Sequence, residues 1–151
     1  MTHINQPTLF RALLGVMACL ALALTIIPAC AEGHFDPGVT GQWKLTSVLD
    51  FADVTALDEN EAQRMVGKVL KIDRATIKLG KRTCGASTFR VERVKRDSDL
   101  RDNAHLRDTT LGLPKQVDVI ELSCAFLYRK TSDRAVLAWE GVFFDVVRVP
   151  R

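Results

Sequence analysis

Short runs in which apolar and polar residues alternate make up most of the chain after residue 40. The runs are rich in β-branched and aromatic residues, and turn-forming residues separate them, which is typical of β-strands. Few of the connections are long enough to hold a crossover helix, which argues against a parallel sheet. The sequence therefore predicts a mostly β protein, a small antiparallel β-barrel or sandwich. The expected strands are residues 41–49, 68–73, 75–80, 87–94, 115–122, 124–130, 133–140 and 141–149.

The later strands allow two more detailed predictions. Alternation continues without a break from residue 120 to residue 128, so residues 115–122 and 124–130 also fit one long bent strand. The last two runs are expected to form a terminal hairpin that turns near Glu140 and Gly141.

One segment has the pattern of a helix instead. Residues 54–67 include Thr55, which lies three residues before Asp58 as in a capping box, and acidic residues crowd the first turn. Gly67 follows as the expected C-terminal cap. The segment is short, so tertiary packing must stabilise it. We expect one short α-helix near residues 56–66.

The charged segment 95–114 does not fit a strand. Long loops in compact domains are often binding elements or lids, and the alternative is a solvated excursion with a helical turn, which we favour. If the segment binds a partner protein, the residues that we expect to take part are Asp99, Arg101, Asp102, His105 and Arg107.

A metal site in the same segment is the less favoured interpretation. Asp97, Asp99, Asp102 and His105 carry side chains that are able to bind a divalent cation. However, the glycine and the bidentate glutamate of an EF-hand loop are both missing, and basic residues lie between the acids. We therefore expect a solvated charged loop, with no metal and no cofactor.

The first residues have the parts of an export signal. A weakly basic start is followed by an apolar run, which Pro28 ends. Small residues on both sides of Cys30 suit cleavage after residue 31, which we favour. The sequence there also resembles a bacterial lipobox, in which lipidation of Cys30 anchors the protein to a membrane. We expect residues 1–31 to be a signal peptide and residues 32–151 to form a single β-rich domain, periplasmic or secreted.

Removal of the signal reduces the four cysteines of the chain to Cys84 and Cys124. An exported protein enters an oxidising compartment, and two cysteines make one intramolecular pair, so we predict a disulfide between them. The alternative is a reactive thiol at Cys84, which needs a nearby base. His34 and His105 are the only histidines after the signal, and the disulfide is favoured.

Charge and motifs argue against several classes of function. The formal net charge is +3, whereas nucleic-acid-binding domains carry a strongly basic surface, so no nucleic-acid partner is expected. The sequence has no glycine-rich phosphate loop, serine-centred elbow or zinc-type spacing, which argues against an enzyme. Glu121 and Glu140 are the strand-borne glutamates in apolar surroundings. We interpret them as structural residues, with Arg90 or Arg148 as the expected partner.

Gly41-x-Trp43 opens the first expected strand, and Arg148 lies near the end of the last one. This pattern resembles the lipocalin and wider calycin family. The resemblance implies an up-and-down barrel in which Trp43 closes one end and the Arg148 guanidinium packs across its ring as a structural clamp. The chain after residue 31 is also similar to small lipocalin-like proteins of bacterial envelopes. That similarity implies a fold and a compartment, but no activity.

Three classes of function remain open because fold alone does not choose among them. The first is a non-enzymatic envelope protein that holds a small apolar ligand in the mouth of the barrel. The second is a protein-interaction module, an inhibitor or docking partner of an envelope enzyme that uses the charged segment 95–114. The third is an unrecognised hydrolase. Membrane contact is expected only if Cys30 is lipidated.

Overall fold

The computed structural model describes residues 38–85, 89–106 and 111–150, which all lie in the compact unit Gly33–Arg151. These residues form nine strands and two short helices, which confirms the predicted mostly β fold and adds a second helix. The elements are β1 (Gly41–Phe51), α1 (Glu59–Gln63), β2 (Val69–Ile72), β3 (Ile77–Leu79), β4 (Arg82–Cys84), β5 (Val91–Lys95), α2 (Arg96–Asp102), β6 (Gln116–Leu122), β7 (Ala125–Arg129), β8 (Arg134–Trp139) and β9 (Val142–Arg148).

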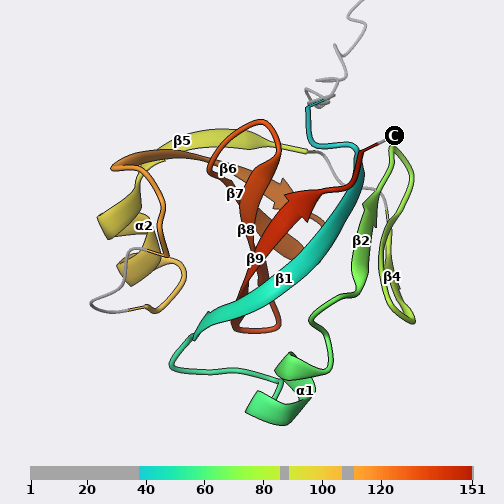
Figure 1. Cartoon of the computed structure of the whole chain (residues 1–151). Helices are drawn as coiled ribbons and strands as arrows, with labels where there is room; N and C mark the ends of the chain where they lie inside the picture. Colours follow the sequence, from blue (N-terminus) through green and yellow to red (C-terminus); the bar gives the residue numbers. More distant parts are fainter. Residues whose placement is uncertain (1–37, 86–88, 107–110, 151) are drawn as a thin grey trace, which may run out of the picture. The chain divides into compact units, whose positions relative to one another are not determined.

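All nine strands belong to one antiparallel sheet in the order β4-β3-β2-β1-β9-β8-β7-β6-β5. The first and last strands of the described chain are neighbours, since β1 pairs with both β2 and β9 (Figure 1). The sheet curls like part of a barrel instead of splitting into two packed sheets. Register shifts in the β1–β9 pairing between Leu45 and Ser47, and between Val48 and Asp50, provide the extra bend that such curling needs.

The hairpin of β8 and β9 turns at Glu140 and Gly141, as the sequence predicts. Both residues have positive φ angles, 53° and 82°, which is the backbone of a tight two-residue hairpin turn. The segment after β1 lies directly against this turn. Ala52 and Ala56 donate backbone hydrogen bonds to the carbonyls of the two turn residues. A Cβ atom at Gly141 would lie 2.5 Å from the Val54 carbonyl oxygen, so only glycine fits this close approach.

The concave side of the curled sheet is filled by side chains. Trp43 and Leu45 of β1 pack there with inward-facing residues of the other strands, such as Phe144 of β9. The largest side chains that are completely buried in this inner core are Trp43, Phe89, Phe144, Leu45, Leu70 and Ile77. The inner core therefore stabilises the curled sheet by burying apolar surface on both halves of it.

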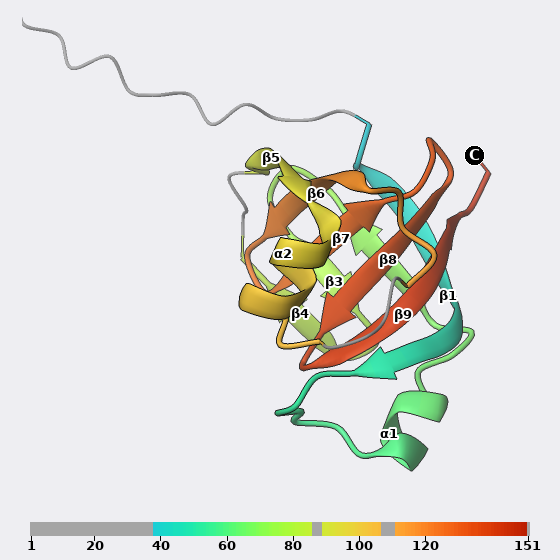
Figure 2. The same cartoon turned by 90° about the vertical axis from the view of Figure 1, so that its left-hand side faces the viewer.

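A second core lies on the opposite, convex side of the sheet. There α2 covers outward-facing side chains of β6 to β9, including Tyr128 and Phe143, and Figure 2 shows this helix in front of β7 and β8. The prediction of a solvated excursion with a helical turn at residues 95–114 is therefore only partly correct. The segment does contain a helical element, but its leucines are buried against the sheet. These leucines are Leu100, Leu106, Leu111 and Leu113.

The first helix differs from the expected one near residues 56–66. It spans only Glu59–Gln63, and its N-cap is Asp58 instead of Thr55. Asp58 accepts a hydrogen bond from the Glu61 amide, and the Glu61 carboxylate accepts one from the Asp58 amide, so a capping box is present three residues later than expected. Thr55 bonds to the Leu57 carbonyl and to the β8–β9 turn, which occupies it outside the helix.

The strands also differ from the expected ones at three places. Residues 82–84 form the edge strand β4, which the sequence does not predict because three residues carry too little pattern. The strand expected at 87–94 is shifted to β5, Val91–Lys95. The run from 115 to 130 is two strands and not one bent strand, because Leu122 pairs with Ala125 across a tight turn.

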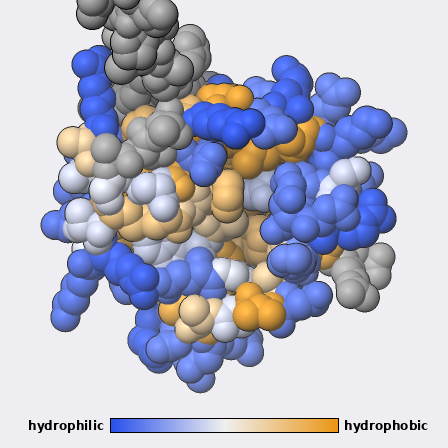
Figure 3. All heavy atoms as spheres, turned by 180° about the vertical axis from the view of Figure 1, so that it is seen from behind, coloured by the Kyte–Doolittle hydropathy of each residue, from blue (hydrophilic) through white to orange (hydrophobic). Residues whose placement is uncertain are grey.

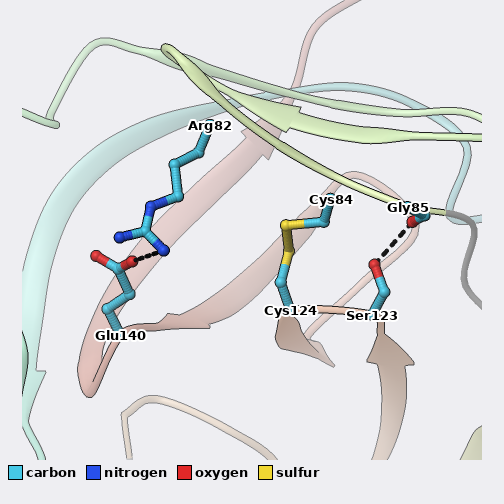
Figure 4. The surroundings of a disulfide bond; sticks show 6 residues. All are labelled: Arg82, Cys84, Gly85, Ser123, Cys124 and Glu140. Atoms are coloured by element: carbon cyan, nitrogen blue, oxygen red, sulfur yellow. Dashed lines mark hydrogen bonds and ion pairs between the residues drawn. A yellow bond between two sulfur atoms is a disulfide. The ribbon is translucent and has the colours of Figure 1, made fainter.

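Three interactions join β4 and the residue after it to the β6–β7 and β8–β9 turns (Figure 4). We call this line of contacts the seam. The predicted disulfide between Cys84 and Cys124 is present and links β4 to the β6–β7 turn. Beside it, the Ser123 hydroxyl donates to the Gly85 carbonyl at 2.8 Å. Arg82 and Glu140 form an ion pair at 2.6 Å between β4 and the β8–β9 turn. These contacts are possible only because the sheet curls back toward its own first edge.

One buried carboxylate supports the convex side. Asp145 of β9 is 6% exposed, and its two oxygens contact Lys130 at 2.7 Å and Arg134 at 3.1 Å. The Thr46 hydroxyl also donates to it. Burial by itself raises the pKa of the Asp145 carboxyl, but the hydrogen bonds and positive charges of Lys130 and Arg134 outweigh burial and lower this pKa below its usual value.

We expect Asp145→Asn to lower the free energy of unfolding at pH 7 by about 2–3 kcal/mol, because hydrogen bonds to charged groups are lost and Lys130 is left without its counter-charge. A carboxyl whose pKa is lowered by folding stabilises the protein above the unfolded pKa of about 3.9, and this stabilisation is lost as the pH falls through the folded pKa. The difference between the two proteins should therefore shrink below about pH 4 in urea unfolding experiments.

A matched control for this variant is Glu92→Gln on β5, where the ion pair with Arg90 is solvent-exposed and 3.8 Å long. It should change stability by less than about 0.5 kcal/mol. An Asp145→Asn protein that is as stable as the wild type at pH 7 would show that the ion pairs of Asp145 with Lys130 and Arg134 make no net contribution to the free energy of unfolding.

Candidate functional site

A pocket of about 650 Å³ lies on the convex side of the sheet, next to α2. Its floor is the outward face of β6 to β9, and β5, α2 with the residues after it, and the segment after β1 form its walls. The volume is within the range of small-molecule binding sites. Side chains fill the inner core, whereas this convex pocket has room for a ligand.

Aromatic and aliphatic side chains form the floor of the pocket. Phe126 and Tyr128 project from β7, and Phe143 projects from β9, with Val119 and Ala138 beside them. Phe126 is a large apolar residue that remains 47% exposed, which is unusual for phenylalanine. Figure 3 shows the rear of the domain, where apolar surface is bordered by hydrophilic residues. Such a floor offers a ligand an apolar and aromatic contact surface without any change in the fold.

The wall formed by α2 is polar. Asp99 lines the pocket although it is only 8% exposed. Its Oδ1 atom accepts a hydrogen bond from the Asn103 side chain at 2.7 Å, whereas its Oδ2 atom is buried and has no hydrogen-bond partner among the described residues. Burial, followed by the negative charge of Asp99, raises the pKa of the Tyr128 hydroxyl well above its ordinary value, so Tyr128 stays neutral.

The charged residues around the pocket are mostly acidic. Five carboxylates and one guanidinium line it, although the whole chain has a positive net charge. The carboxylates are Glu92, Asp99, Asp102, Glu121 and Glu140, and the guanidinium is Arg90. The ion pair with Arg82 compensates Glu140, and Glu92 lies 3.8 Å from Arg90. The field in the pocket therefore favours positive charge.

The two glutamates that we interpreted as structural have different surroundings from those expected. Glu140 does form an ion pair, but its partner is Arg82 and neither Arg90 nor Arg148. The expected partner is wrong because Arg82 belongs to β4, a strand that the sequence does not predict. Glu121 is exposed and lines the pocket, opposite Phe126 in the β6–β7 pairing.

The structure separates the residues that were expected to form a partner-binding loop. Asp99, Asp102 and His105 line the pocket, with Asp99 buried and the other two exposed. Arg101 is not among the residues that line the pocket, and it lies 3.5 Å from Asp102 in an exposed ion pair. Arg107 lies outside the described residues. Of the described residues, no group of three or more histidine, cysteine, aspartate or glutamate side chains is close enough to hold a metal ion.

Trp43 and Arg148 lie together at the end of β9 that is farther from the pocket. They are register partners in the β1–β9 pairing, and the Arg148 guanidinium carbon is 4.4 Å from the centre of the Trp43 ring. The Trp43 indole donates to the Val39 carbonyl at 2.9 Å, and Arg148 donates to the carbonyls of Gly38 and Thr40. These contacts tie the chain before β1 to the last strand and place both residues away from any ligand in the pocket.

The disulfide contributes to the pocket as well as to the fold. Cys124 lies in the pocket lining, at the β6–β7 turn, and its bond to Cys84 fixes the position of that turn. Cys30, the alternative site of lipidation, lies outside the described residues, and its modification stays a prediction. Within residues 38–85, 89–106 and 111–150, no helix has the length and apolar character needed to cross a membrane.

Most of the pocket floor was not predicted from the sequence. The alternation of residues 120–128 predicts that Phe126 and Tyr128 share a face with Ile120 and Leu122, but Ile120 and Leu122 lie in the inner core and Tyr128 lies on the convex side. Phe143 is predicted only as part of a strand. One signal was present, because β7 and β9 are apolar on both faces. A strand that faces solvent on one side alternates, whereas a strand that is covered on both sides does not.

No protein-family model matches this chain, and neither the curated proteins nor the solved structures include one that is significantly similar to it.

Proposed function

We propose that the chain is an exported, non-enzymatic binding protein that holds a small, largely apolar ligand in the pocket on the convex side of the sheet. The observation that carries the proposal is the pocket floor, where Phe126 stays half-exposed beside Tyr128 and Phe143. The proposal differs in one respect from the expectation of a ligand in the mouth of a lipocalin-like barrel. Since side chains fill the inner core, the ligand is assigned to the outside of the curled sheet.

The proposed location is a compartment outside the cytosol. Support comes from the apolar N-terminal run that resembles an export signal and from the Cys84–Cys124 disulfide, which persists in an oxidising environment. The lipocalin-like character of the protein is part of the same proposal, and the packing of Arg148 over Trp43 supports it.

We expect a neutral apolar fluorophore, N-phenyl-1-naphthylamine, to bind the purified protein with increased fluorescence. The variant Phe126→Ala should weaken this binding roughly fivefold to tenfold, because the ligand loses aromatic contact area in the floor of the pocket. Since the ring is already half-exposed in the folded protein, its removal should have little effect on stability. Fluorescence titration measures the dissociation constant, and circular dichroism checks the fold.

The matched control is Val91→Ala on β5, which also removes an exposed apolar side chain but lies outside the pocket lining. This variant should bind the fluorophore as the wild type does. Equal weakening by both variants would mean that the fluorophore binds exposed apolar surface in general, and no binding to the wild type would refute a preformed apolar pocket.

A protein-interaction role for the segment 95–114 is the second candidate. It is favoured by the exposed ion pair of Arg101 and Asp102, whose side chains are both 66% exposed. Removing the segment would also uncover the convex core, so deletion is not a clean test. The double variant Arg101→Glu with Asp102→Lys reverses both charges without touching the buried leucines. Loss of a copurified envelope protein with this variant would support the role, and unchanged copurification would count against it.

A further inference from the structure

The pocket contains a buried charge that no residue in the described part of the chain neutralises. Asp99 has no ion-pair partner among the described residues, and one of its two carboxylate oxygens lacks any hydrogen bond there. A buried carboxylate in this state is costly, and such groups in native proteins usually have a partner. Two independent features therefore coincide in one place, a pocket of ligand size and an unsatisfied anion on its wall.

The other charges do not supply the missing partner. Arg90, the one guanidinium in the lining, lies 3.8 Å from Glu92, and Arg101 lies beside Asp102 on the exposed side of α2. Tyr128 lies beside Asp99, and burial, that negative charge and a hydrogen bond to Asp99 together raise the pKa of its hydroxyl. A neutral phenol is unable to balance the charge of Asp99. A positively charged group of a ligand would balance it.

The chemistry of the lining decides what kind of cation fits. A divalent metal ion needs several oxygen ligands at one point, and the described residues have no such group. Anionic ligands are disfavoured by the five carboxylates of the lining. An ammonium group attached to an apolar body suits both halves of the pocket, because the Asp99 carboxylate neutralises its charge and the aromatic rings of Phe126, Tyr128 and Phe143 attract a cation as well as an apolar body.

We propose that the ligand of this pocket is an organic amine, with its ammonium group at Asp99 and its apolar part on the aromatic floor of β7 and β9. The inference rests on the proposed binding function and adds the class of ligand to it. After a small rotation of the Asp99 side chain, the ammonium group donates a hydrogen bond to Oδ2, and the Asn103 amide continues to hold Oδ1.

Three probes of nearly equal size and different charge test this inference. They are 4-phenylbutylamine, 4-phenylbutanol and 4-phenylbutyrate, and each is used to displace the neutral fluorophore at pH 7 and 0.15 M salt. We expect the amine to bind at least tenfold more tightly than the alcohol, and the carboxylate to bind most weakly. In the variant Asp99→Asn, which keeps the size of the side chain, the preference for the amine over the alcohol should fall to within twofold, and binding of the alcohol should be nearly unchanged.

The matched control is Asp102→Asn, which removes an exposed carboxylate from the same wall of the pocket. Because water and salt screen that charge, the preference for the amine should change by less than twofold. A wild-type protein that binds the amine and the alcohol equally would overturn the inference and leave the proposed function intact. Failure of every neutral and charged probe to bind would overturn both. The wild-type ratio decides the question even if Asp99→Asn does not fold.

Discussion

Replacing Trp43 by alanine is expected to lower the free energy of unfolding by about 3–5 kcal/mol, the usual cost of removing a large aromatic side chain from a core. Trp43 is 2% exposed and packs in the inner core between β2 and β9. The variant leaves a cavity there and also removes the surface on which Arg148 lies. Urea denaturation, followed by circular dichroism, measures the change. The fluorescence of the remaining Trp139, which is buried, provides a second signal of unfolding.

Two further variants separate the contributions to this effect. Leu49→Ala removes an exposed apolar side chain from the same strand and should cost less than about 1 kcal/mol. Arg148→Ala removes the stacked guanidinium with its hydrogen bonds to Gly38 and Thr40, and should cost less than Trp43→Ala. If Trp43→Ala proved nearly neutral, Trp43 would not close the inner core and the clamp would have no structural role.

Loss of the disulfide is the second large effect that we expect. Cys84→Ser and Cys124→Ser should each lower the free energy of unfolding by roughly 3–4 kcal/mol, because the bond closes a long loop and restricts the unfolded chain. The two single variants and the double variant should be equally unstable, since each lacks the same bond. Intact mass after alkylation, with and without reductant, identifies the bond directly, and two alkylations should require reduction.

The ion pair in the same seam provides the control. Arg82→Ala removes the contact to Glu140, but the Arg82 side chain is 68% exposed, so the cost should be below about 1 kcal/mol. Clearly different stabilities of the two cysteine variants would mean that one of the side chains contributes something other than the bond. Such a difference would point to Cys124, which also lines the pocket.

Much of the sheet was predictable because its signals are local. Alternation along β8 and β9 and the turn residues Glu140 and Gly141 predicted the terminal hairpin, and the structure confirms it. The predicted helix at 56–66 is longer than the observed one. Its acidic residues fit a first helical turn after either Thr55 or Asp58. The hydrogen bond of Thr55 to the β8–β9 turn makes Asp58 the N-cap. β4 was missed because its three residues form a strand through pairing with β3.

The candidate site was much less predictable. The sequence indicates Asp99 and His105 as candidates for partner binding or for a metal site, both in a segment that is expected to be solvated. Whether an aspartate on a short charged helix is solvated or buried depends on which face of the helix packs against the sheet. Leu100 is the only apolar residue of α2, and it anchors the helix to the convex core, which leaves the neighbouring Asp99 buried at the wall of the pocket.

The sequence by itself determined the mostly β class, the antiparallel pairing of neighbouring strands and the pairing of Cys84 with Cys124. Each of these follows from periodicity, from short connections or from the number of cysteines that remain after residue 31. Only the tertiary structure decided that the core has two sides, that Glu140 pairs with Arg82, and that a pocket lies between α2 and the sheet. These features depend on the curl of the sheet, which brings together residues far apart in the chain and leaves no local pattern in the sequence.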